Sequence, residues 1–171
     1  KTAPEIKAGK LEQKLGEFTI IEGIPGSILP NRTIKLTFPE GVKWCKAPSV
    51  VAEKGNDLIL SIDKNTDADG VDQYYDSGRT VVLQTVASPS ITTPSVLRLE
   101  NAQVTAEGDF NGDIKLTVGG TAGVTGTVVV GKVVPAVTVE AVTPATNVII
   151  GQQKQAITTL TITEGTKEAL I

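Results

Sequence analysis

The sequence predicts an all-β fold: an antiparallel Ig-like β-sandwich with an extra terminal β-segment. Apolar and polar residues alternate along the chain with the period of two that places apolar side chains on one face of a strand. Clusters of Gly, Pro, Asn and Asp separate these stretches at intervals of about 8 to 15 residues, which is typical of a sandwich or barrel. Thr and Val are abundant in the second half, and β-branched side chains suit a pleated surface.

Five alternating stretches predict half-buried strands. In chain order, the residues expected to face inward are Phe18 and Ile20; Ile34, Leu36 and Phe38; Leu58, Leu60 and Ile62; Leu97 and Leu99; and Ile114, Leu116 and Val118. Runs of β-branched residues at 128–130 and 137–139 predict further strands toward the C-terminus. Turn signals such as Pro39-Glu40-Gly41 and Gly55-Asn56-Asp57 lie between these strands.

Trp44 and Cys45 lie in the strand expected to begin near Val42. Trp44 shares the parity of Val42, so we expect it in the core at one end of the sandwich. Cys45 then lies on the opposite face or in the following loop. We expect a buried free thiol, with an intermolecular disulfide as the alternative.

The chain also contains an internal repeat. When the sequence is shifted by 142 residues, its start aligns with its end over about 29 residues without a gap. Matched pairs include Gly9 with Gly151, Gln13 with Gln155, Leu15 with Ile157, Phe18 with Leu160, Thr19-Ile20 with Thr161-Ile162, and Glu22-Gly23 with Glu164-Gly165. We therefore predict a β-sandwich module at 1–142 and the start of a second repeat at 143–171. Residues 147–163 are expected to share the conformation of residues 5–21.

Three segments carry a resemblance to a known family. They are the run from Phe18 to Gly23, the run from Arg32 to Trp44, and the run from Ile114 to Gly120. Together they resemble the repeats of large secreted Firmicute surface proteins, which are often labelled copper amine oxidase N-terminal domain-containing. The resemblance covers most of residues 5–141 and the tail, and implies a β-sandwich module of a surface or fibrous protein. Oxidase chemistry is not implied, because the chain has no His to hold copper.

The composition argues against an enzyme. The chain has no His and one Cys, which removes most routes to proton shuttling, metal catalysis and thiol chemistry. Asp76-Ser77-Gly78 resembles the aspartic protease motif, but that chemistry needs two carboxylates sharing a proton, and the sequence holds one copy. We expect a turn before a strand at 80–86 and no catalytic residues.

Charge and hydropathy limit the partners. The net charge is −3, with Lys and Glu interspersed, so no basic field for nucleic acid is expected. Apolar runs such as 127–130 are far shorter than the ~20 residues that span a bilayer, so no membrane insertion is expected. The chain opens at Lys1 with no initiator Met, which favours processing of a secretory signal, with an excerpt of a longer polypeptide as the alternative. The predicted location is extracellular or at the cell surface.

One acidic stretch carries the pattern of a calcium loop. Oxygen-bearing side chains recur at every second position before Gly70, at Asp63, Asn65, Asp67 and Asp69. The helix and the bidentate Glu of an EF-hand are absent, and Asp, Asn and Gly also form ordinary solvated turns. Calcium is therefore the one cofactor considered, with a plain turn as the alternative.

These observations predict a structural protein. The expected function is a subunit or module of an extracellular bacterial filament, stalk or surface layer, which assembles with copies of itself head to tail by β-strand addition. The tail is expected to act as an inter-subunit or inter-module strand, with an interface formed by Ile157, Leu160, Ile162 and Leu170. The alternative is that the tail belongs to the next module of one longer polypeptide. The alternative is an adhesive or carbohydrate-binding surface module, which would need an exposed aromatic cluster; aromatic residues make up only 4% of the chain.

Overall fold

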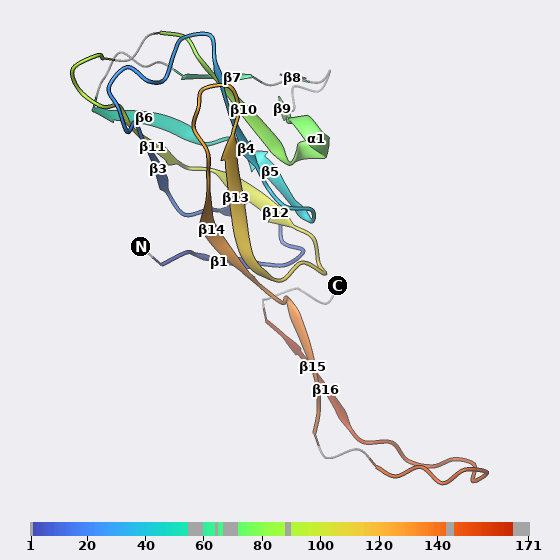
Figure 1. The fold of residues 1–171 in the computed structure, drawn as a ribbon. Coiled ribbons are helices and arrows are strands. Elements are labelled where there is room, and N and C mark those ends of the chain that lie inside the picture. Colours follow the sequence, from blue (N-terminus) through green and yellow to red (C-terminus); the bar gives the residue numbers. More distant parts are fainter. Residues whose placement is uncertain are drawn as a thin grey trace.

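The fold consists of a β-sandwich from which a two-stranded arm projects (Figure 1). Strands make up 50% of the chain and helix 3%, which confirms the predicted all-β class. The computed structural model describes residues 2–54, 60–63, 65–66, 72–87, 90–142 and 146–165.

One layer of the sandwich is a six-stranded sheet. Its strand order is β1 (Glu5–Lys7), β14 (Gly126–Val134), β13 (Gly112–Gly119), β4 (Thr33–Thr37), β10 (Thr80–Thr85) and β7 (Leu60–Asp63). All neighbours are antiparallel except β1, which runs parallel to the C-terminal part of β14. Residues 126–129 of β14 extend beyond β1, so this part of the strand pairs only with β13 among the described strands.

The other layer contains two short three-stranded sheets laid end to end. One has the order β3 (Phe18–Ile21), β11 (Val96–Glu100) and β6 (Ser49–Lys54); the other has the order β2 (Gln13–Lys14), β12 (Gln103–Ala106) and β5 (Val42–Lys46). β2 and β3, β5 and β6, and β11 and β12 are consecutive along the chain, so the layer is three long strands, each interrupted once. β3 lies at its edge.

The core lies between the two layers and is built from the alternating residues. Ile34, Leu36, Leu97, Ile114 and Leu116 are fully buried, and Phe18, Ile20, Phe38, Leu99 and Val118 are nearly so, as predicted. Leu60 and Ile62 are half-buried against this core, and Leu58 lies outside the described residues. Period two therefore identified the inward face of each strand, because successive side chains point to opposite faces.

Trp44 is a core residue, as predicted from its parity with Val42. It is 5% exposed, and its ring centroid lies 4.2 Å from that of Phe38. Its indole N–H donates a hydrogen bond to the backbone oxygen of Arg79 at 2.9 Å. The buried indole therefore has the partner that burial of a polar group requires.

The remaining elements are short. β8 (Asn65–Thr66) pairs with β9 (Asp72–Gln73), and α1 (Tyr75–Gly78) is a single turn before β10. The arm begins after Pro135: β15 (Val137–Ala141) pairs antiparallel with β16 (Leu160–Glu164). The sandwich therefore ends at β14, and the predicted module of residues 1–142 ends within the arm.

Candidate functional site

The arm (residues 137–165) presents an apolar face to solvent. In its register Val139 lies opposite Ile162 and Ala141 opposite Leu160, so these four side chains share one face. Val139 is 60% exposed, Leu160 56% and Ile162 57%. Thr138 pairs with Thr163 on the other face. A two-stranded ribbon with one exposed apolar face is only marginally stable by itself in water.

Residues 147–163 repeat the turn conformation of residues 5–21. Both copies turn through residues with positive φ at equivalent positions: Gly9 (75°) and Glu12 (54°) in the first copy, and Gly151 (84°) and Lys154 (56°) in the second. The predicted sharing of conformation is confirmed at these turns, where the repeat is structural as well as sequential. It is wrong for residues 147–149 and 155–156, which form no strands where residues 5–7 and 13–14 form β1 and β2.

A glutamine side chain closes the turn in each copy. Oε1 of Gln13 accepts the N–H of Lys7 at 2.7 Å, and Nε2 donates to the carbonyls of Lys7 and Lys10 at 2.8 Å. Gln155 makes the same three bonds, at 2.5, 2.7 and 2.7 Å, to the N–H and carbonyl of Ile149 and the carbonyl of Gln152. We call this arrangement the glutamine clamp. Because its bonds are local, it forms in both copies whatever surrounds them.

The two copies differ completely in burial. Ile6, Ala8, Leu15, Phe18 and Ile20 are each at most 8% exposed in the sandwich. Their counterparts are apolar but exposed: Val148 (64%), Ile150 (101%), Ile157 (77%), Leu160 (56%) and Ile162 (57%). Strands β1 and β2 also have no strand counterparts at 147–149 and 155–156, because β14 and β12 pair with the first copy only.

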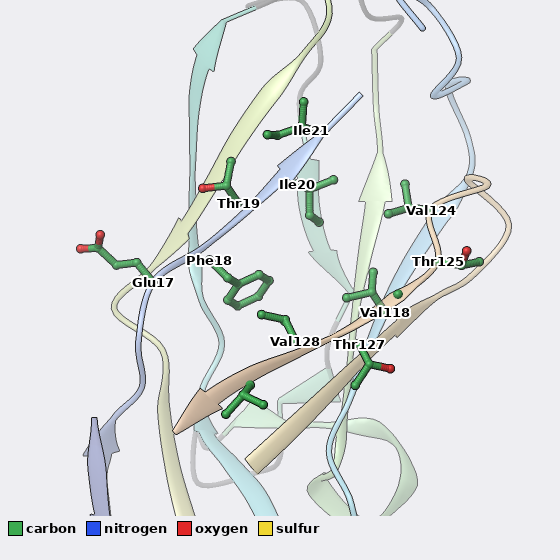
Figure 2. Close-up of a pocket in the computed structure, with 12 residues that line it drawn as sticks. Glu17, Phe18, Thr19, Ile20, Ile21, Val118, Val124, Thr125, Thr127 and Val128 are labelled. Carbon is green, nitrogen blue, oxygen red and sulfur yellow. The ribbon is translucent and has the colours of Figure 1, made fainter. Parts of the chain in front are cut away.

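A groove in the sandwich lies between β3 and the 126–129 part of β14; we call it the β3–β14 groove. It has a volume of about 550 Å³. Phe18 and Ile20 of β3 face Val118, Val124 and Val128 across it (Figure 2). Both bordering strands pair on one edge only within the described part of the chain. The groove therefore combines an apolar floor with two open strand edges.

Three of the four predicted interface residues lie in the arm. Ile157, Leu160 and Ile162 lie in the arm and are exposed. Leu170 lies outside the described residues. Sequence reasoning missed β15 as the partner strand and missed the groove. The glutamine clamp had a sequence signal, because Gln13 and Gln155 match under the repeat, but its hydrogen bonds could not be read from the pattern.

The proposed calcium loop lies mostly outside the described residues. Asp63 ends β7 and is exposed, and Asn65 begins β8, whereas Asp67 and Asp69 lie in a stretch that is not described. The hydrogen bond from Tyr75 to Asp63, with burial and the charge of Asp63, raises the pKa of Tyr75. Within the described ranges no three His, Cys, Asp or Glu residues group as metal ligands. Calcium binding stays a prediction, to be checked by thermal unfolding with and without a chelator.

Two smaller predictions have different outcomes. Cys45 points away from the core as expected, but the expectation of a buried thiol is wrong: Cys45 is exposed, with Sγ 2.9 Å from the hydroxyl of Thr105. The reason is strand parity, since Trp44 occupies the inward position. Asp76-Ser77-Gly78 forms the expected turn before β10, with positive φ at all three residues and an ion pair from Asp76 to Arg79 at 2.7 Å.

A second hollow of about 550 Å³ lies outside β4 and β10. The hollow is lined by Thr33, Lys35, Thr37, Asp63, Tyr75, Asp76, Thr80 and Val82. Tyr75, 39% exposed, is its single aromatic residue. A platform of several aromatic rings, which the carbohydrate-binding alternative would need, is not formed by the residues lining this hollow.

Comparisons with protein-family models, with curated proteins and with solved structures returned no match. No helix in the described part of the chain is both long enough and apolar enough to cross a bilayer.

Proposed function

We propose that this chain is a structural module of an extracellular bacterial filament, stalk or surface layer, and that it associates head to tail with copies of itself. The arm is the contact element, and the contact forms by β-strand addition. One observation carries the proposal: residues 147–163 keep the turns of a segment that belongs to a sandwich, yet the residues that the sandwich would bury are exposed.

The arm has an apolar face and strand edges that nothing covers among the described residues. Its strand edges carry backbone groups that template further pairing. The β3–β14 groove gives every copy an apolar surface with open strand edges, and this surface is distinct from the arm. A contact between unlike surfaces of identical units does not close on itself by necessity, so it propagates into a chain of units.

The surface setting is supported by the resemblance to secreted Firmicute surface repeats at 18–23, 32–44 and 114–120. Such proteins carry modules in series, in which neighbouring units contact through a repeated interface. The arm of this chain has the features that such an interface needs.

The proposal is tested by deleting the arm from the chain. A chain ending after Pro135 should remain folded and monomeric in sedimentation velocity, whereas the full chain should form oligomers or fibres visible by electron microscopy. Oligomers of equal size from the shortened chain would overturn the proposal.

A matched pair of variants separates the apolar face from the arm as a whole. Val139→Asp with Ile162→Lys places an ion pair on the apolar face, and Thr138→Asp with Thr163→Lys places the same pair on the polar face. The first variant should abolish association and the second should retain it. Equal loss in both would show that the apolar face is not the contact.

A further inference from the structure

We propose that the β3–β14 groove is the acceptor site of the assembly, and that the strand which fills it is β15 of a second copy. The identification of a second copy as the partner rests on the proposed function. The site and the register follow from the repeat and from the pairing of β15 with β16.

The first step is that β16 is the repeat copy of β3. Under the shift of 142 residues, Leu160 corresponds to Phe18 and Ile162 to Ile20. In the sandwich, β3 pairs with β11 on one edge and with no described strand on the other. In the arm, β16 pairs with β15. The arm therefore shows which strand the repeat sequence of β3 accepts.

The second step transfers the register. In the arm, Ala141 lies opposite Leu160 and Val139 opposite Ile162. On β3 the same pairing places Ala141 opposite Phe18, Val139 opposite Ile20 and Val137 opposite Glu22. The carboxylate of Glu22 already accepts the N–H groups of Ser95 at 2.9 Å and Ile28 at 3.0 Å, so an apolar neighbour leaves it satisfied.

The two faces of β3 differ in exposure. Phe18 and Ile20 are buried and point toward the groove, whereas Thr19 and Ile21 of the same strand are exposed (Figure 2). Residues opposite each other in an antiparallel pair share a face. Val139 and Ala141 would therefore lie over the apolar lining of the groove, which includes Val118, Val124 and Val128. Thr138 and Glu140 would face solvent.

The chain that precedes the second repeat copy lies along β16, the counterpart of β3. In the arm, the N–H of Val142 donates to the oxygen of Thr159 at 2.9 Å, which continues the ladder beyond Ala141. Residues 146 and 158 correspond to Pro4 and Gly16 of the first copy. In the sandwich Pro4 packs directly on Gly16, because a Cβ added to Gly16 would lie 3.2 Å from Cδ of Pro4. A strand that precedes residue 1 would thus reach the open edge of β3.

Transfer of β15 from the arm to the groove conserves its strand pairing and adds burial of apolar surface. When β15 moves from β16 of its own chain to β3 of a second copy, the ladder of five residue pairs is conserved. The gain is the apolar surface of Val139 and Ala141, together with the groove lining, which is removed from water. The five residue pairs lost with β16 are replaced by five with β3 of the second copy.

The experiment places the donor strand in the same chain. Residues 136–142 are copied directly before Lys1 of the full chain; because residue 143 is the repeat equivalent of residue 1, this reproduces the spacing of the arm. The tether raises the effective concentration of the strand at the groove. We expect the midpoint of thermal unfolding to rise by about 5 °C, and no rise when the copied Val139 is changed to Asp.

A disulfide tests the register. In a Cys45→Ser background, Thr19→Cys should cross-link with a Cys at the copied Glu140, because the register places these two outward residues opposite each other. The control pairs Ile21→Cys with the same copied position and should not cross-link. Cross-linking of the control at the same rate would overturn the register, and cross-linking of neither would overturn the site.

The grafted chain also separates this inference from the proposed function. A filled groove should stop other copies from adding, so grafted chains should cap the assemblies formed by ungrafted chains. Association that persists in the grafted chain, with no rise in midpoint, would overturn the groove and leave the proposed function standing. A rise in midpoint with no association of ungrafted chains would support the groove and overturn the proposed function.

Discussion

Residues 5–21 and residues 147–163 form the same turns in opposite surroundings. In the first copy Leu15 is 8% exposed, and in the second its counterpart Ile157 is 77% exposed. The glutamine clamp is present in both. Strands β1 and β2 exist only in the first copy, where β14 and β12 pair with them. The comparison shows that the turns are specified by local sequence, whereas a strand forms only where a partner strand lies beside it, as β15 does for β16, and burial requires the rest of a sandwich.

The largest difference should appear when the same apolar contact is removed from each copy. Phe18→Ala should lower the free energy of unfolding by about 3–5 kcal/mol, because it empties a buried site. Leu160→Ala should change it by less than about 0.5 kcal/mol, because Leu160 is 56% exposed in the arm. Urea unfolding of both variants at a concentration where the chain is monomeric is the measurement. Equal losses would mean that the arm is packed in solution.

Glu22 should give the next largest difference. Burial alone would raise its pKa, but hydrogen bonds from Ser95, Ile28 and Gly26 outweigh burial and hold the pKa below its ordinary value of 4.5. The stability that Glu22 contributes is therefore present above its unfolded pKa and is lost as pH falls through its folded pKa. Glu22→Gln should destabilise the protein by about 1–3 kcal/mol at pH 7 and flatten the acid limb of the stability curve.

The matched control is Glu164→Gln. Glu164 is the repeat counterpart of Glu22 and lies exposed at the end of β16. Its substitution should change the stability at pH 7 by much less than Glu22→Gln does, because the Glu164 side chain is exposed. An equal loss in the two variants would contradict the assignment of this stability to the buried carboxylate.

The smallest difference concerns the glutamine clamp. Gln13→Ala should cost about 1 kcal/mol of global stability, because the clamp positions β1 and β2 against the sandwich. Gln155→Ala should leave global unfolding unchanged but speed amide hydrogen exchange at Ile149 and Gln152, whose turn it closes. Unchanged or slower amide exchange at Ile149 and Gln152 in the Gln155→Ala variant would show that the turn holds without its glutamine.

Much of the fold could be predicted from sequence. Alternation identified the inward faces of the strands at 18–20, 34–38, 97–99 and 114–118, because strand geometry has a strict period of two. The repeat predicted the shared turns of the two copies. The parity of Trp44 placed both its own side chain and the outward direction of Cys45.

The groove and its open edges could not be predicted. They depend on which strands become neighbours, and alternation carries no information about pairing between distant segments. β3 and β14 are far apart in the sequence, and each is an ordinary strand by itself. Glu22 was likewise missed as a buried carboxylate, because its partners Ser95 and Ile28 are recognised only once the loops have folded around it.

The glutamine clamp has a consequence for the thermodynamics of docking. A disordered segment that binds must lose backbone conformational entropy, at a cost of roughly 1–2 kcal/mol for each residue that becomes fixed. In the arm, Gln155 already holds residues 149–152 in the conformation that the first copy has in its sandwich. That part of the cost is therefore met before any partner arrives, so a contact made by this segment spends less of its free energy on ordering the backbone.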